Sequence, residues 1–445
     1  MPQRSISMER ILARDLKAAA DSGKKDIFLM GWVHRIRELG AVNFVVLRDR
    51  SGLFQAVFDK KIEMTLESVV KVEGEAALNE KAPGGAELRV TNLEVLSAAA
   101  SDLPFQVNGD ISKIGIEAIL DQRSLSLRNP KIRALFKVQS TIIEAFSQYL
   151  RGLDFTEIKS SKLIGSGTEG GTNLFEVDYF ERKVYLAQSP QVYKQTMIAS
   201  GLERVFEVAP AYRAEKHDTP RHLNEYVSMD LEMAFIESEK ELIKLETDLL
   251  AYIFEEVARK NSSEIALWEK DGASLPSPEA VAKSPTVSYE EALKIANNEA
   301  SKEKGGSKGR IFDISPEAER TLCLWALREC GSELVFVNEF PRKERPFYTY
   351  PMDATRTMSF DAIFRGLEIT SGGRRQNIYK EQLEAMPRFG LNPSDMEAYL
   401  SIFKYGCPPH GGFAIGCERL TAKIFRLANV KEASLFPRDR KRVAP

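Results

Sequence analysis

Tyr212-Arg213-Ala214-Glu215 is the stretch around which the second half of this 445-residue chain is organised. Residues 205–212 before it and residues 224–235 after it alternate apolar and polar side chains, which predicts two antiparallel strands. Side chains two residues apart on a strand point to one face, so Arg213 and Glu215 are expected to project together into one site. Because strands joined by turns outnumber strand-helix-strand crossovers, we expect an α+β domain with an antiparallel sheet.

The residue types in this stretch suit a phosphate-bearing ligand. The guanidinium of Arg213 can clamp a phosphate or carboxylate through two hydrogen bonds, and the Glu215 carboxylate can accept a base amine. Arg221 and His222 follow across a loop rich in Lys, His and Asp. An Arg-x-Glu pair by itself is a weak signal, because most such pairs are exposed ion pairs of little consequence.

A second signal lies near the C-terminus, in Gly411-Gly412-Phe413-Ala414-Ile415-Gly416-Cys417-Glu418-Arg419. Glycines let a backbone approach a ligand closely, and a helix beginning around Cys417 would place Arg419 near its positive end. A glycine-rich stretch alone is a poor predictor. Followed by Leu420 and preceded by Pro408-Pro409-His410, this one is a strong signal.

The N-terminal part of the chain predicts a small barrel. Short strands bounded by turn residues are expected at 26–33, 43–48, 53–58, 69–77 and 87–96. An OB-fold is the economical interpretation, and Tudor-like or SH3-like barrels are the alternatives. Residues 1–105 are assigned to the barrel, 106–130 to a linker and 131–445 to the α+β domain, with a polar surface insertion around 262–312.

These motifs together resemble the class II aminoacyl-tRNA synthetases, and within them the compact archaeal type of the aspartyl family. Arg213-x-Glu215 resembles motif 2, the stretch ending in Glu418-Arg419 resembles motif 3, and residues 152–158 occupy the place of motif 1. The resemblance implies an N-terminal OB-fold β-barrel for the anticodon, a class II catalytic domain with an antiparallel sheet flanked by helices, and a homodimer. Two departures are Ser161, where motif 1 normally ends in proline, and Ala414, where motif 3 usually has glycine.

The substrate amino acid is suggested by Gln188-Ser189-Pro190-Gln191-Val192-Tyr193-Lys194. Ser189 and Pro190 predict a helix start, with Ser189 as the N-cap and Pro190 at the first helical position. The body of the helix is expected over 191–200. Lys194 on its first turn is expected to aim an ammonium into the pocket, where a desolvated cation would reject a neutral isostere. The resemblance implies that L-aspartate is held by Glu169, Gln191, Val192, Tyr193, Lys194, Arg213, Ser371 and Arg375.

The same resemblance assigns the nucleotide site. ATP is expected at Arg213, Ala214, Glu215, Arg221, His222, Leu223, Glu368, Gly416, Cys417, Glu418 and Arg419. Arg213 and Arg419 are the expected catalytic residues. Glu368 and Ser371 match Mg²⁺-binding positions, and Mg²⁺ prefers such oxygen ligands. The implied reaction is attack of the aspartate carboxylate on the ATP α-phosphorus, followed by transfer to the tRNA 3′-terminal hydroxyl.

Anticodon reading is expected on the barrel. An aromatic side chain on an OB sheet can stack a splayed base, and Gln or Arg can read its polar edge. The resemblance implies that Arg37, Phe44 and Gln55 recognise the central anticodon uridine, with a plain core role as the alternative for Phe44. His34 and Pro83 resemble the relaxed members of the family, which charge tRNA(Asn) as well as tRNA(Asp).

Composition excludes several classes of protein. The chain has 62 Lys and Arg against 64 Asp and Glu, a net charge of −2, so it is no generic polycation. Its four cysteines form no C-x-x-C pair, which argues against a zinc site and for reduced thiols. No apolar run approaches the length of a membrane span. A soluble cytoplasmic protein is expected.

Other functions remain as alternatives. They are a discriminating aspartyl enzyme, an asparaginyl enzyme of the same fold, a non-catalytic RNA-binding paralogue, and an enzyme that uses the adenylate to form an amide without tRNA. The joint presence of Arg213, Glu215, Glu368 and Arg419 argues against the non-catalytic paralogue. The barrel argues against the tRNA-independent enzyme.

Overall fold

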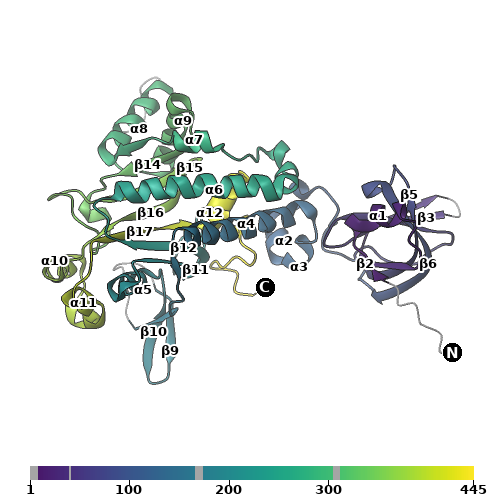
Figure 1. Cartoon of the computed structure of the whole chain (residues 1–445), viewed down its shortest axis with the longest axis horizontal. Coiled ribbons are helices and arrows are strands. Elements are labelled where there is room, and N and C mark those ends of the chain that lie inside the picture. The colour runs from purple at the N-terminus through teal and green to yellow at the C-terminus, as the bar shows by residue number, and fades with distance from the viewer. Residues whose placement is uncertain (1–8, 40–41, 166–173, 304–310, 445) are drawn as a thin grey trace. The chain divides into compact units, whose positions relative to one another are not determined.

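The computed structural model describes residues 9–39, 42–165, 174–303 and 311–444 (Figure 1). The chain divides into two compact units, Met1–Ala118 and Ile119–Pro445. Within the described ranges, no helix has the length and apolar character needed to cross a bilayer.

The first unit is a closed barrel. Around it run β2 (Ile27–Leu39), β3 (Val42–Arg48), β4 (Leu53–Phe58), β6 (Ala86–Ser97) and β5 (Val69–Leu78), and β5 pairs back onto β2. β1 (Glu9–Arg10) adds to β2 in parallel, and α1 (Leu16–Asp21) packs against β5. Every second residue of β4 is buried, as expected for a strand with one face on a core. The predicted OB-fold barrel is confirmed, although β2 runs six residues beyond its predicted end.

The second unit is built on a sheet of eight strands in the described part of the chain. Their order is β13 (Thr286–Ser288), β14 (Leu334–Asn338), β15 (Ser359–Phe364), β16 (Leu367–Arg375), β17 (His410–Gly416), β12 (Glu225–Ala234), β11 (Arg204–Tyr212) and β7 (Thr156–Glu157). The pairings are antiparallel except for the outermost pair at each edge. A separate small sheet holds β8 (Leu163–Ile164), β10 (Arg182–Leu186) and β9 (Glu176–Tyr179). The predicted fold class is confirmed.

Two long helices run along one side of the large sheet, α4 (Pro130–Gly152) and α6 (Glu239–Ala266) (Figure 1). The N-terminus of each helix is stabilised by a cap. Asn129 is the N-cap of α4 and precedes Pro130, and Ser238 and Glu241 form a capping box at the start of α6. α12 (Cys417–Ile424) packs against α4 and against the sheet. It begins at Cys417, where the sequence predicted a helix start. The other helices are α2 (Ile116–Asp121), α3 (Arg123–Ser126), α5 (Gln191–Met197), α7 (Pro278–Ala282), α8 (Tyr289–Glu303), α9 (Pro316–Cys330), α10 (Tyr379–Ala385) and α11 (Glu397–Lys404).

Two local expectations differ from the structure. Pro190 is the N-cap of α5 and not its first helical residue, so the predicted cap lies one residue too early, and the Ser189 hydroxyl accepts the Gln191 N–H at 3.3 Å. The helix also ends early, in a wide turn at Ile198–Leu202. The segment expected as a surface insertion contains an edge strand and a helix of the domain, with Val287 and Ala292 buried in an apolar cluster.

Candidate active site

The turn between β11 and β12 places Arg213. Its N–H donates to the Asn224 carbonyl at 2.9 Å, and its carbonyl accepts from the Asn224 side-chain amide at 2.7 Å. The prediction that Arg213 and Glu215 share a strand is wrong, because β11 ends at Tyr212 and both belong to the loop that follows. Both still line one cavity, since the Asn224 amide also holds the Glu215 carbonyl, at 3.2 Å.

That cavity gathers nine of the eleven residues predicted for ATP. They are Arg213, Glu215, Arg221, His222, Leu223, Glu368, Gly416, Glu418 and Arg419, and Ser371 lies among them. The two exceptions are Ala214, which lines a neighbouring cavity, and Cys417, whose side chain is fully buried in α12. The cavity therefore joins the loop after β11, two central strands and the first turn of α12.

Charge inside the cavity is arranged by burial and pairing. Arg419 Nη1 donates to the Glu368 carbonyl at 2.9 Å and to its carboxylate at 3.2 Å. Burial, aided by the charge of Arg419, lowers the pKa of His222, so this imidazole is neutral at pH 7. Burial raises the pKa of Glu418 to about 7, and its carboxyl group accepts the Val227 N–H at 3.0 Å and 3.1 Å. Glu418 thus ties α12 to β12.

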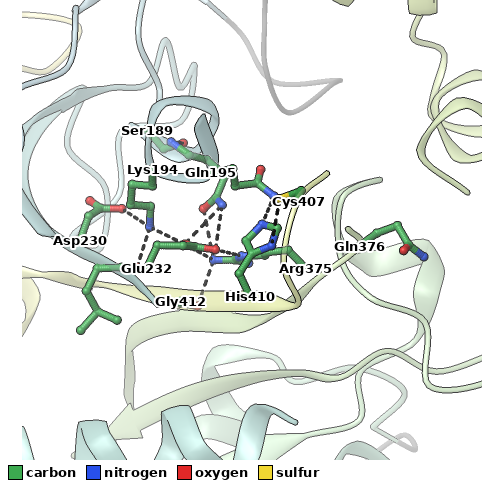
Figure 2. Close-up of polar contacts among 12 residues, drawn as sticks. Ser189, Lys194, Gln195, Asp230, Glu232, Arg375, Gln376, Cys407, His410 and Gly412 are labelled. Atoms are coloured by element: carbon green, nitrogen blue, oxygen red, sulfur yellow. Dashed lines mark hydrogen bonds and ion pairs between the residues drawn. The ribbon is translucent and has the colours of Figure 1, made fainter. Parts of the chain in front are cut away.

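Farther along the same strands lies a buried network of charged side chains (Figure 2). The Lys194 ammonium is 2.9 Å from Asp230 Oδ1, 3.3 Å from Glu232 Oε2 and 3.1 Å from the Leu231 carbonyl. Its side chain is 1% exposed. The Leu231 carbonyl accepts a hydrogen bond from this ammonium, and the two carboxylates form ion pairs with it. The predicted contact of Lys194 with the substrate stays a prediction, and in this structure its ammonium is paired with two carboxylates.

Arg375 is paired in the same network through its Nε and Nη2 atoms. Its Nε donates to Glu232 Oε1 at 2.8 Å, and its Nη2 donates to the Gly412 carbonyl at 2.9 Å and to Gln191 Oε1 at 3.2 Å. Burial alone would lower the pKa of this guanidinium, but Glu232 raises it. Among the described residues, Nη1 makes no hydrogen bond. Nη1 is therefore the group through which this network can bind a ligand carboxylate directly.

Gly412 allows Arg375 and Glu232 to meet. In the sheet, Glu232 on β12 and Gly373 on β16 lie opposite Gly412 on the intervening strand β17. A Cβ at position 412 would overlap the Leu231 carbonyl oxygen and the Glu232 carboxylate. The missing side chain therefore opens the space in which side chains from strands on either side of β17 form an ion pair.

A set of side chains that sequence reasoning missed supports this network. His410 is fully buried and stands opposite Arg375 in the sheet. Its Nδ1 is 2.8 Å from the Pro408 carbonyl, which only accepts, so Nδ1 carries the proton and Nε2 accepts from Gln195 at 2.9 Å. Tyr399 donates to Gln195 Oε1 at 2.9 Å. The strand alternation of Asp230 and Glu232 was a usable sequence signal for the carboxylates, but nothing local indicated Gln195 or Tyr399.

Beside the nucleotide cavity lies a second one rich in carboxylates, lined by Asp313, Ile314, Glu319, Phe340, Glu344, Arg345, Asp361, Ile363 and Glu368. Asp361 stands opposite Ser371 in the sheet, and its Oδ2 is 2.8 Å from Arg345. The Ser371 hydroxyl accepts from Arg345 at 2.8 Å. Glu368, Ser371 and Asp361 therefore offer oxygen donors on adjacent strands, the set that a hard cation prefers.

The other residues predicted to bind aspartate lie in different parts of the catalytic domain. Val192 packs on the apolar cluster around α10 and α11, and Tyr193 is half-buried on α5. Glu169 lies outside the described residues. Ser371 and Arg375 project to one face of β16 four residues apart, a separation of about 13 Å along a strand, with Gly373 between them. A Cβ at Gly373 would lie 2.7 Å from the Met358 carbonyl oxygen, so the close packing of β16 on its neighbour requires glycine here.

On the barrel, three predicted anticodon residues share an outer face. Arg37 is opposite Phe44, and Gln55 is opposite Val46, two residues along β3 from Phe44. Phe44 lies between the buried Asn43 and Val45, so its ring points away from the core. A half-buried aromatic on the outer face, flanked by Arg and Gln, is the arrangement that stacks and reads a single-stranded base.

The two residues expected to relax tRNA choice lie elsewhere on the barrel. His34 sits at a β-bulge in β2, half-buried, and its carbonyl accepts from Asn108 at 2.6 Å. Pro83 opens the short turn Pro83–Gly85 that joins β5 to β6. Both are in irregular backbone, where side chains can face a ligand without belonging to the core.

Comparison with known proteins agrees with this geometry. The sequence family described as tRNA synthetases class II (D, K and N) matches residues 115–440, and an OB-fold nucleic acid binding domain matches residues 27–96. A relative from Thermus thermophilus, named Aspartate--tRNA(Asp/Asn) ligase, is 46% identical over 98% of this chain and 100% of its own length. A relative of the same name from Deinococcus radiodurans is 43% identical over 98% and 99%.

A solved structure extends the comparison. The asparaginyl-tRNA synthetase of Pyrococcus horikoshii, complexed with asparaginyl-adenylate, superposes with a TM-score of 0.85 at 31% identity and covers 96% of this chain and 98% of that one. The fold and the site together define a class II tRNA synthetase. Within that class, the chain belongs to the D, K and N family, with its OB-fold domain at the N-terminus.

Proposed function

We propose that this enzyme ligates L-aspartate to tRNA through an aspartyl-adenylate, and that it charges both tRNA(Asp) and tRNA(Asn). The observation that carries the proposal is the buried network of Lys194, Glu232 and Arg375 beside a nucleotide cavity on the same strands. A guanidinium nitrogen at the end of that network selects a carboxylate side chain, because its N–H groups need acceptors, whereas an amide presents an NH₂ donor in place of one carboxylate oxygen.

The adenylation step follows from the positions of two arginines. Bound aspartate attacks the ATP α-phosphorus through its α-carboxylate oxygen, the bond from that phosphorus to the bridging oxygen breaks, and pyrophosphate leaves with the electron pair. Arg213 offsets the charge that develops on the α-phosphate oxygens, and Arg419 on α12 holds the nucleotide from the opposite side. No general base is required, because the attacking carboxylate is already ionised.

A divalent cation suits the donor set of this site. Glu368 and Ser371, with Asp361 beside them, would hold Mg²⁺ together with phosphate oxygens of ATP. When bound, Mg²⁺ would offset phosphate charge during the reaction. Within the described residues, no group of three or more His, Cys, Asp or Glu side chains could hold a metal alone, in keeping with an ion that arrives with the nucleotide.

Aspartate selection is assigned to Arg375 in the first place. Its Nη1 can donate to the substrate side-chain carboxylate directly, whereas the Lys194 ammonium is already paired with Asp230 and Glu232. Gln191 and Glu232 hold the guanidinium in position. Lys194 and Arg375 are balanced by Asp230 and Glu232, so a neutral buried network becomes selective through its geometry rather than through excess charge.

The choice of tRNA is assigned to the barrel. Arg37, Phe44 and Gln55 would hold the central anticodon base, and His34 and Pro83 would tolerate either pyrimidine at the base that distinguishes the two tRNAs. The two relatives named for both tRNA(Asp) and tRNA(Asn) support this part of the proposal. A cytoplasmic homodimer, in which each subunit carries a complete set of these residues, belongs to the same proposal.

Two assays test the proposal in sequence. Pyrophosphate exchange into ATP should depend on aspartate and not on asparagine, and a preference for asparagine would overturn the amino acid assignment. Charging of purified tRNA(Asp) and tRNA(Asn) with aspartate should then reach completion for both. Failure with tRNA(Asn), at enzyme levels that fully charge tRNA(Asp), would leave a discriminating aspartyl enzyme.

A further inference from the structure

A large basic cavity adjoins the nucleotide cavity and shares no lining residue with the charged network. Its volume is about 640 Å³. It shares Arg221, His222, Glu368, Arg419 and Val430 with the nucleotide cavity, so the two are continuous. Its outer wall comes from α9, the turn before β16 and the second turn of α12.

Two cations in this cavity are not balanced by carboxylates. Arg221 is paired with Glu319 at 2.6 Å, and Arg419 is paired with Glu368 at 3.2 Å. The cavity also contains Arg320 and Lys423. Neither of their charged groups makes a hydrogen bond or ion pair with any residue in the described part of the chain. The wall therefore carries two surplus positive charges in addition to its internal ion pairs.

The position of Lys423 indicates a ligand rather than a solvated surface. It lies four residues after Arg419 on α12, so the two side chains lie on the same face, one turn apart. Lys423 is half-buried, and its pKa is lowered by burial and by the charges of Arg221 and Arg320. A flexible lysine would ordinarily extend into water to escape such neighbours. The Lys423 ammonium instead lies near Arg221 and Arg320, as expected for a cation that lines an anion-binding site.

The side chain of Arg320 packs against the backbone of Gly366. Gly366 adopts φ +74°, and a Cβ there would lie 2.7 Å from Cγ of Arg320. The arginine stem therefore packs on the bare backbone of the turn between β15 and β16, and this places its guanidinium at the cavity wall. The same turn leads into Glu368, so Arg320 is coupled to the strand that bears the proposed Mg²⁺ donors.

We propose that Arg320 and Lys423 form a binding site for the pyrophosphate released during adenylation. This inference rests on the proposed function, because only an adenylating reaction supplies pyrophosphate at this position. The anion leaves the α-phosphorus next to Arg221 and Arg419, and the surplus cations lie along the continuous cavity that leads away from it. Such a site binds the product after bond cleavage, and also binds it when the reaction runs backward.

The test measures the back reaction of the full-length enzyme. Lys423→Gln and Arg320→Gln should each raise the KM for pyrophosphate in aspartate-dependent exchange about 5-fold, since each removes one charge-assisted contact. The KM values for ATP and aspartate should stay within about twofold of wild type. Lys423→Arg should retain most of the pyrophosphate affinity, and Lys380→Gln, an equal charge change on exposed α10, should have no effect. Melting temperatures of all variants confirm folding.

Each outcome decides a different question. An unchanged KM for pyrophosphate in both Gln variants would overturn the site. An equal rise in the KM values for ATP and pyrophosphate would show that the two residues bind the nucleotide itself, and would also overturn it. Absence of aspartate-dependent exchange in the wild type would instead contradict the proposed function. Direct titration with inorganic pyrophosphate should show binding to wild type that is weakened about 10-fold or more in the double Gln variant.

Discussion

Nη1 of Arg48 lies 3.1 Å from Nδ1 of His34, while the same guanidinium forms a buried ion pair with Glu67 at 2.7 Å. An arginine only donates, so Nδ1 of His34 must accept and the imidazole proton must reside on Nε2. Burial and the Arg48 charge also lower the pKa of His34, which keeps it neutral at pH 7. His34 therefore presents a single N–H donor on Nε2, which makes no hydrogen bond within the described residues. Both C and U carry pyrimidine carbonyl oxygens that accept such a donor.

Replacing Arg48 should affect stability and tRNA charging separately. Arg48→Leu removes the guanidinium that pairs with the buried Glu67 carboxylate, at a cost of about 3–5 kcal/mol in the free energy of unfolding of the barrel. Arg48→Leu/Glu67→Leu should recover most of that loss, because the pair is replaced by apolar groups. Thermal denaturation followed by circular dichroism measures both.

The double variant also isolates the role of Arg48 in orienting His34. It should charge tRNA(Asp) and tRNA(Asn) with reduced kcat/KM, since His34 no longer has a fixed tautomer. Its aspartate-dependent pyrophosphate exchange, which needs no tRNA, should equal that of wild type. A stable double variant with wild-type charging would show that Arg48 is only structural.

Arg375 should determine aspartate use. Arg375→Gln removes the guanidinium nitrogen available to a substrate carboxylate and leaves Glu232 paired only with Lys194. We expect kcat/KM for aspartate in pyrophosphate exchange to fall at least 100-fold, because the loss of a buried charge pair costs about 3 kcal/mol or more, while the KM for ATP changes little.

The matched control for this variant is the preceding residue in the chain. Arg374 points to the opposite face of β16, where its guanidinium stacks on Tyr350 at 3.8 Å. Arg374→Gln should keep aspartate kinetics close to wild type. Equal losses in the two variants would mean that the Arg375 effect reflects damage to the sheet and not loss of a substrate contact.

Gly412 should tolerate no side chain. Gly412→Ala forces a methyl group into the Leu231 carbonyl and the Glu232 carboxylate, so we expect a loss of about 1–3 kcal/mol in stability and a raised KM for aspartate. Gly416→Ala is the comparison, since its nearest neighbour would be the Arg419 side chain at 3.6 Å. It should retain stability. If the two variants melt alike, the close approach at Gly412 does not constrain the pocket.

Glu246 should make stability fall as pH rises. Burial raises the pKa of this carboxyl from 4.5 to about 8. The folded state therefore retains a proton that the unfolded state loses, so stability is greatest below pH 4.5 and declines as pH approaches 8. The full loss has an upper limit of about 4–5 kcal/mol. Glu246→Gln should raise the melting temperature at pH 8.5 and change it little at pH 5, and equal shifts at both pH values would contradict this assignment.

Much of the architecture could be predicted from local sequence signals. Alternation with a period of two located the barrel strands to within a few residues. The exception is β2, because its second half is polar and was not predicted as strand. The nucleotide residues could be grouped because motif 2 and motif 3 each keep several functional side chains within ten residues, so their spacing carries information without any knowledge of the fold.

The partners of the buried charges could not be predicted in this way. Lys194 and Arg375 were recognisable as cations of a selective site, but Glu232 joins them only because β12, β17 and β16 are neighbours in the sheet. Likewise, Arg320 and Lys423 share a cavity although they stand about a hundred residues apart and belong to no motif. The sequence by itself determined the two domains through local periodicity, and the family through the resemblance of its motifs to those of known synthetases. Only the tertiary structure decided which charges neutralise each other and which stay available to a ligand, because pairing depends on strand register and on distances between segments far apart in the chain.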